Sequence, residues 1–261
     1  MHVVVIFGWK EETPEFVRSL SDALRATVFE ARQRIVGGGP AVVASFSDPA
    51  QAAVLESKLA QKGIKALVLD AATACSSAAR FIVRRFELGD SSLRSETGDG
   101  QSDKIPYSEI DVLLSGMSIS GTVETRTVTE RRLSLGKTLL SGGIPMTKKV
   151  AHQEEVTTEE RRKFLYLYAG ERLPVVFSQD GMTYDGLGPA MKPSRELNFA
   201  YLLSELRRLS PNAVYDDRLL TRLGQIRLLG PAQNPETNLD LGAAILAACL
   251  LPQGRDRFDT E

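Results

Sequence analysis

The chain is poor in cysteine, has no long apolar run and carries no strong net charge. Its 261 residues contain only Cys75 and Cys249, and two cysteines so far apart cannot build a disulfide framework or a zinc site. We therefore expect a reduced, cytoplasmic setting. The longest apolar run, residues 241–251, falls well short of the roughly 20 residues that span a bilayer, so we expect no membrane span. A net charge of −1 gives no global electrostatic reason for nucleic-acid or membrane-surface binding.

Histidine is equally scarce, with only His2 and His152. A Ser–His–Asp or Cys–His arrangement would have to recruit one of them, and neither lies near a nucleophile-elbow motif. Metal sites built on histidine would have too few ligands. We predict no catalytic residue, no cofactor and no metal, and keep an enzyme of unknown class as an alternative.

Residues 1–71 read as strand, helix, helix, strand, helix, strand, which predicts a small α+β domain. The predicted strands cover residues 2–7, 41–46 and 64–69. Thr13-Pro14 and Ser47-Asp48-Pro49 are typical helix starts, and a second short helix covers residues 28–36. The triplet Gly37-Gly38-Gly39 follows a helix and opens a strand, which is the wrong polarity for a phosphate-binding loop. We interpret it as a helix stop and turn.

The segment Val28-Phe29-Glu30-Ala31-Arg32 resembles the Leu-Lys-Glu-Ala-Lys helix in the C-terminal domain of the bacterial ribosomal stalk protein, whose fold the ClpS adaptor shares. The Ser47-Asp48 helix start is also similar. The resemblance covers residues 1–71 and implies a non-catalytic docking platform. Arg32 stands where the stalk has its second docking lysine and Phe29 replaces the first, so both are candidate partner-binding residues. The apolar Phe29 also fits a core position.

Residues 72–79 are small and polar enough for a linker, or for one short helical turn. From residue 80 to 211 the sequence becomes rich in predicted strands, with a hairpin turn at residues 98–100 and a closing helix capped by Ser194. Its expected apolar stripe is Leu197, Ala200, Tyr201, Leu203, Leu206 and Leu209. This order, with the phrase Ile105-Pro106-Tyr107-Ser108-Glu109-Ile110, resembles a bacterial pleckstrin-homology-like domain. The resemblance implies an antiparallel β-barrel that binds partners or lipids.

A long insertion, at about residues 133–162, departs from that pattern. Residues 124–150 hold six basic and two acidic side chains. The basic ones are Arg126, Arg131, Arg132, Lys137, Lys148 and Lys149. A basic, glycine-containing loop could bind an acidic partner, a phosphate or a nucleic acid through residues 126–149. It could equally be a solvated loop that keeps the chain soluble.

The sequence of residues 212–261 predicts a C-terminal helical segment and a polar tail. A helix is expected over residues 218–229, with Asp216-Asp217 complementing the dipole at its start and Leu219, Leu220, Leu223 and Ile226 as its apolar stripe. The apolar helix that follows is expected to pack against a domain, with a homo-oligomer contact through residues 239–251 as the alternative. Together these features predict a cytoplasmic two-domain adaptor that binds a protein partner.

Overall fold

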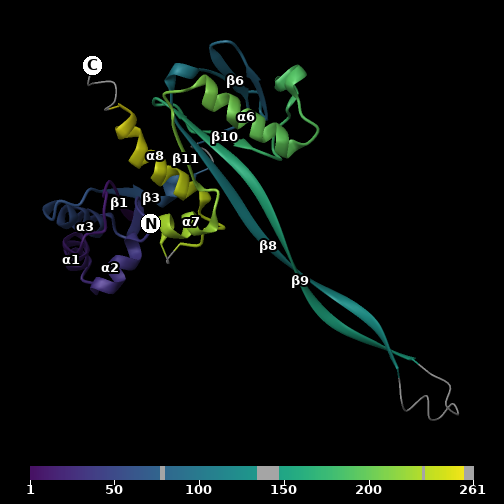
Figure 1. Ribbon diagram of the computed structural model, residues 1–261, viewed down its shortest axis with the longest axis horizontal. Coiled ribbons are helices and arrows are strands. Elements are labelled where there is room, and N and C mark those ends of the chain that lie inside the picture. Colours follow the sequence, from purple (N-terminus) through teal and green to yellow (C-terminus); the bar gives the residue numbers. More distant parts are fainter. Residues whose placement is uncertain (77–79, 134–146, 231–232, 256–261) are drawn as a thin grey trace. The chain divides into compact units, whose positions relative to one another are not determined.

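The computed structural model describes residues 1–76, 80–133, 147–230 and 233–255 and is drawn in Figure 1. Its contacts divide the chain into two compact units. The first comprises Met1–Ser118 and Arg162–Glu261, and the second comprises Ile119–Arg161. Helices and strands are both present in quantity, so the predicted mixed α+β character is confirmed.

The first 70 residues form the predicted order of elements. They are β1 (His2–Ile6), α1 (Pro14–Leu24), α2 (Val28–Ile35), β2 (Ala41–Phe46), α3 (Pro49–Gln61) and β3 (Ala66–Asp70). The three strands pair antiparallel in the order β2-β1-β3. Successive strand residues point to opposite faces of a sheet. Val4 and Ile6 accordingly pack with α1, α2 and α3, whereas Val3 and Val5 pack with the C-terminal helix α8 (Leu239–Arg255).

The helix starts of this region are set by local chemistry. The Thr13 hydroxyl accepts a hydrogen bond from the backbone N–H of Phe16 at 3.2 Å. At the start of α2, Thr27 and Glu30 form a reciprocal capping box, with bonds of 2.8 and 3.2 Å. Such caps satisfy the first free N–H groups of a helix, which is why the sequence located these helices well.

The glycine triplet stops α2, as interpreted from its position. Gly37 and Gly38 have φ of 92° and 83°, a region that favours glycine. A Cβ at Gly37 would lie 2.6 Å from Nη1 of Arg227, and a Cβ at Gly39 would overlap the indole ring of Trp9. The turn is therefore required both for backbone conformation and for close packing.

The later strands form two sheets. They are β4 (Phe81–Ile82), β5 (Arg85–Leu88), β6 (Ser92–Glu96), β7 (Ser102–Pro106), β8 (Ile110–Leu133), β9 (Thr147–Ala169), β10 (Val175–Ser178) and β11 (Val214–Leu219). One sheet has the order β11-β8-β9-β10-β4 and the other the antiparallel order β5-β6-β7. The pairs β10·β4 and β11·β8 are parallel. Within the described residues no closed barrel is found, and these two parallel pairs differ from the antiparallel order that we expected. Such parallel pairs join strands far apart in sequence, which local turn signals cannot reveal.

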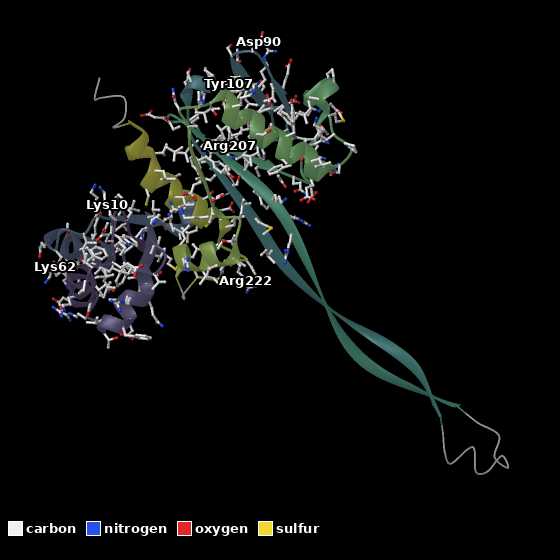
Figure 2. The ribbon with its side chains drawn as sticks, viewed as in Figure 1. Lys10, Lys62, Asp90, Tyr107, Arg207 and Arg222 are labelled. Atoms are coloured by element: carbon white, nitrogen blue, oxygen red, sulfur yellow. The ribbon has the colours of Figure 1, made fainter. Side chains whose placement is uncertain are left out.

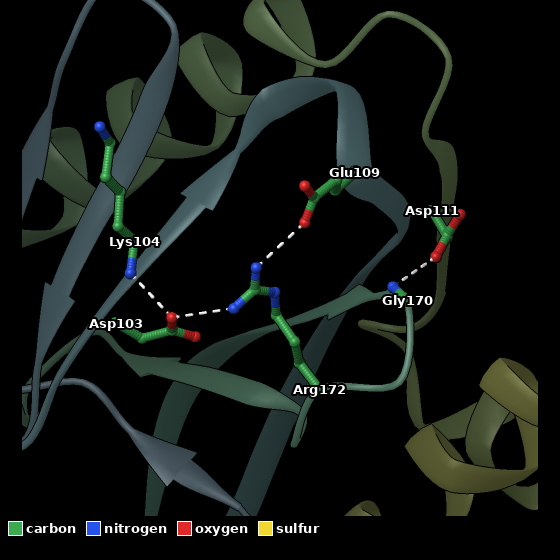
Figure 3. A network of polar contacts seen from close by, with 6 residues as sticks. All are labelled: Asp103, Lys104, Glu109, Asp111, Gly170 and Arg172. Atoms are coloured by element: carbon green, nitrogen blue, oxygen red, sulfur yellow. Dashed lines mark hydrogen bonds and ion pairs between the residues drawn. The ribbon is translucent and has the colours of Figure 1, made fainter.

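Arg172 connects the β9–β10 turn to the phrase around residues 105–110 (Figure 3). Its guanidinium lies 3.0 Å from Asp103 and 3.1 Å from Glu109. Nearby, the backbone N–H of Gly170 donates to Asp111 at 2.8 Å. Tyr107, in the short helix η2 (Tyr107–Glu109), is buried and donates its hydroxyl proton to the Gly89 carbonyl oxygen at 3.1 Å. The phrase that resembled a strand opener therefore ends β7 and begins β8.

Helix α6 (Arg195–Leu209) is capped by Ser194, as predicted, and its buried face overlaps the predicted stripe in part, at Leu206 and, partly buried, at Tyr201, Leu203 and Leu209. Its buried residues are Asn198, Phe199, Leu202 and Leu206, whereas Leu197 is 53% exposed. Asn198 can be buried because its side chain accepts from the N–H of Lys192 at 2.6 Å and donates to the carbonyl of Lys192 at 3.0 Å. The predicted stripe is wrong at Leu197 and Ala200, which are exposed, because it assumed that the polar side chain of Asn198 faces water.

The segment after α6 also differs from prediction. Asp216 and Asp217 lie on β11, not at a helix start, and Asp216 accepts from Arg218 Nε at 2.8 Å. The helix is α7 (Arg222–Leu229), capped by Thr221. Arg222, labelled in Figure 2, pairs with Glu236 at 3.4 Å.

One hydrophobic cluster includes residues from both sides of the predicted 72–79 linker, such as Val5 and Leu114. Part of that linker is a short helix, α4 (Ala71–Ala74), and residues 77–79 lie outside the described residues. Helix α8 contributes its buried Leu241, Ile245 and Leu246 to the same cluster. Those side chains are covered by this chain, which leaves the homo-oligomer contact through 239–251 without support.

Of the predicted insertion at about 133–162, the described residues are strand, and residues 134–146 lie outside the described residues. Residues 119–133 continue β8 and residues 147–161 begin β9, which neighbour each other in the sheet (Figure 1). Among the described helices, none has both the length and the apolar character needed to cross a bilayer.

Candidate functional site

Helix α2 exposes an apolar and basic face. Its buried residues, Ala31 and Ile35, are four positions apart and pack into the core of the N-terminal sheet. Because α2 has 3.6 residues per turn, Phe29 and Arg32 lie away from that stripe, and both are exposed. Phe29 has 69% of its surface exposed. The alternative that Phe29 is a core residue is therefore wrong.

A groove of about 550 Å³ lies on one side of α2. It is bounded by the end of α1, by β2 and by α3, with Val43, Phe46 and Leu55 among its apolar lining residues. Arg25 and Lys58 are basic residues of its wall. We call this the α2–α3 groove.

A second groove, of about 490 Å³, lies between the end of α2 and α7. Val36, Leu223 and Ile226 line it, and all three are exposed. We call this the α2–α7 groove. Arg34 lines both grooves and donates from Nη1 to the carbonyl oxygen of Val43 at 2.9 Å. Since both grooves share α2 and Arg34, they form one continuous region.

This region, here the α2 surface, combines exposed apolar side chains with unpaired cations. Its grooves are lined by Val36, Val54, Leu223, Ile226, Arg25, Arg34, Lys58 and Arg227, and we include in it the exposed Val28, Phe29 and Arg32 of α2, which line neither groove. Six of the eleven large apolar side chains found exposed in the described residues belong to it. In the same part of the chain, none of its five cations forms an ion pair. Hydrogen bonds from Thr27 hold the pKa of the nearby Glu30 carboxyl below its usual value, so this acid serves the helix cap.

The sequence indicated part of this surface and missed the rest. Phe29 and Arg32 were candidates through the stalk resemblance. Leu223 and Ile226 were expected to be buried, but α7 instead buries Gln225, Leu228 and Leu229. The neighbouring Leu228 and Leu229 could have indicated the buried face of α7. Gln225 obscured this pattern, because a polar side chain is not expected to be buried. It is buried here because it donates to the Leu219 carbonyl at 2.6 Å.

The predicted basic positions lie elsewhere in the chain. Arg126, Arg131 and Arg132 are on β8, and Lys148 and Lys149 are on β9. Lys137 lies outside the described residues. The glycine-containing part of the expected loop, residues 134–146, also lies outside the described residues.

A second cluster of polar groups lies at the start of α8. Arg80 forms an ion pair with Asp240, and the Tyr166 hydroxyl donates to the same carboxylate at 2.9 Å. These residues line a cavity of about 220 Å³. Burial, followed by the charge of Asp240, raises the pKa of Tyr166 well above its usual value, so the phenol stays protonated. The cluster therefore stabilises the junction of β9, α8 and the residue-80 segment, and leaves the carboxylate already paired.

The described residues offer little for metal or thiolate chemistry. They contain no group of three or more metal-ligating side chains. Burial raises the pKa of Cys249 to about 12 and also raises the pKa of Cys75. Neither thiol is activated as a nucleophile at neutral pH.

Among these features, the α2 surface combines exposed apolar side chains, two grooves and basic residues. Comparison of the chain with protein-family models, with curated proteins and with solved structures gives no match.

Proposed function

We propose that this protein is a cytoplasmic, non-catalytic adaptor that binds a protein partner through the α2 surface. The observation that carries the proposal is the exposure of Phe29 and Arg32 on α2, the helix whose other residues line two grooves. Clustered exposed apolar side chains are typical of interaction sites. Aromatic residues and arginine are also the residue types most enriched where binding energy concentrates.

The positive charge of the α2 surface favours a partner with acidic residues. Arg25, Arg34, Lys58 and Arg227 line the two grooves and Arg32 is exposed on the same helix, so the best-fitting partner segment presents apolar side chains flanked by carboxylates. Such complementary charge steers association and excludes basic segments. The similarity of residues 1–71 to the ribosomal stalk and ClpS domains, which are docking platforms, is consistent with this proposal.

Peptide binding tests the proposal. A panel of acidic amphipathic peptides, and the same peptides with lysine in place of glutamate, would be titrated by fluorescence polarisation. We expect the acidic set to bind and the lysine set not to bind. Phe29→Asp and Arg32→Glu should each weaken binding by about tenfold or more.

Two matched variants control for changes in charge alone. Leu197→Asp alters an exposed leucine on α6, and Arg18→Glu reverses an exposed arginine on α1. Neither residue belongs to the α2 surface. Equal loss of binding in these controls, or unchanged binding in Phe29→Asp, would count against the proposal.

Anion or nucleic-acid binding is the second candidate. β8 ends at Leu133 and β9 begins at Thr147, so Arg131 and Arg132 lie at the end of one strand while Lys148 and Lys149 open its neighbour. This function predicts retention on heparin that decreases steeply with salt. Replacing Arg131 and Arg132 by alanine would then lower the eluting salt concentration, while Phe29→Asp would not.

A further inference from the structure

Beyond Gly116, strand β8 lacks a neighbour on one side within the described residues. β8 pairs with β9 on one side and with β11 on the other. The β11 pairing involves Val112 to Gly116 only, and β11 is six residues long. Residues 119–133 therefore form an open sheet edge.

Such an edge presents free N–H and C=O groups that can pair with another strand. Natural edges are protected by proline, lysine or short length. Residues 117–133 contain neither proline nor lysine, and β8 is 24 residues long. Threonine and valine dominate residues 122–129, a composition that favours strand pairing. Since a two-stranded ribbon alone is only marginally stable in water, added strands would stabilise this one.

The charges along β8 are complementary to those of a second β8 running antiparallel. If residue 128 lies opposite itself, Glu124 lies opposite Arg132, and Arg126 lies opposite Glu130. Positions two apart share a face of a strand, so these four positions and Val128 form one row. Because the arrangement has two-fold symmetry, each opposite-charge pair occurs twice.

The same row disfavours neighbouring registers. Moving the two-fold centre to residue 127 places Glu124 opposite Glu130, and moving it to residue 129 places Arg126 opposite Arg132. Like charges directly opposite each other destabilise a strand pair. The sequence of β8 therefore selects one antiparallel register over the two closest ones.

We propose that two copies of the chain associate through β8, antiparallel and centred on Val128, giving the strand order β9-β8-β8-β9. In this arrangement Arg126 and Arg132 pair with glutamates of the second copy instead of binding an anion. It leaves the pairing of β11 with residues 112–116 intact. The association does not depend on the α2 surface.

Cross-linking tests the register. In a Val128→Cys variant of the full chain, the two new cysteines would lie directly opposite each other, at a Cα separation of about 5 Å, which a disulfide can bridge. Mild oxidation should give a covalent dimer that a reductant dissociates. Thr125→Cys is the control, because position 125 lies opposite 131, so its two copies are about 20 Å apart and should not cross-link. Equal cross-linking of both variants, or of neither, would overturn the register.

Charge reversal tests the interaction itself by sedimentation equilibrium. We expect wild type to dimerise, Arg126→Glu to raise the dimer dissociation constant about tenfold or more, and Arg126→Glu/Glu130→Arg to restore it. The double variant keeps opposite charges across the axis and therefore also controls for folding. A monomer at every soluble concentration of wild type, or a dimer unaffected by Arg126→Glu, would overturn the proposal.

Discussion

Tyr166 on β9 donates a hydrogen bond to Asp240 at the start of α8, across 2.9 Å. The same carboxylate pairs with Arg80. Three segments far apart in sequence therefore meet at one acid, with Arg80 and Asp240 both mostly covered.

Removing that acid should destabilise the fold. Asp240→Asn leaves Arg80 without its counterion, and we expect a loss of about 3 kcal/mol in the free energy of unfolding, measured by urea denaturation. The matched control is Glu96→Gln, which breaks the exposed pair with Arg85 and should change stability by less than about 0.5 kcal/mol. Equal effects of the two variants would contradict a stabilising role for the buried cluster.

The glycine turn makes a second prediction. Gly39→Ala should cost about 2 kcal/mol, because its Cβ would overlap Trp9, which itself stacks on Phe16 at 5.8 Å. Gly98→Ala introduces a Cβ into open space at an ordinary φ and should be close to neutral. Thermal unfolding of both variants checks the difference, and a neutral Gly39→Ala would show that Trp9 does not pack there.

The buried face of α6 can be checked by paired truncation. Leu206 is fully buried and Leu197 is exposed. Leu206→Ala should lower the free energy of unfolding by about 3 kcal/mol, and Leu197→Ala by less than about 0.5 kcal/mol. The opposite ranking would contradict the buried position of Leu206.

How far the sequence could predict the structure depends on where each signal lies along the chain. Elements fixed by nearby residues were located well, because caps such as Thr27 with Glu30 and stops such as Gly37 act within a few positions. The parallel pairing of β11 with β8 was not predicted, since its paired residues lie about 100 positions apart in the sequence. The stripes predicted for α6 and α7 left out Asn198 and Gln225, which are buried because their side chains donate to backbone carbonyls, those of Lys192 and of the distant Met117.

The candidate site was predictable only in part for the same reason. Phe29 and Arg32 are on one helix and could be indicated by a local resemblance. Leu223, Ile226 and Arg227 join them only because α7 packs near the end of α2, about 190 residues away in sequence. No local pattern carries that information.

Alkaline pH should reveal the buried thiol of α8. Burial raises the pKa of Cys249 to about 12 from an ordinary 9.0, so above pH 9 the unfolded chain loses this proton while the folded chain keeps it. The contribution of the protonated Cys249 thiol to the free energy of unfolding is fully present below pH 9 and is lost as the pH rises toward 12. The free energy of unfolding should therefore fall less steeply over this window in Cys249→Ala than in wild type. Below pH 8 the two curves should run parallel, and identical slopes above pH 9 would show that Cys249 is not buried in the folded protein.

The most direct test of the adaptor proposal is quantitative capture of partners from cell extract by wild type, Phe29→Asp and Leu197→Asp, with folding of each verified by circular dichroism. We predict that one set of proteins binds wild type and Leu197→Asp equally, is lost with Phe29→Asp and elutes as salt rises. A set retained equally by all three proteins would contradict the α2 surface as the binding site.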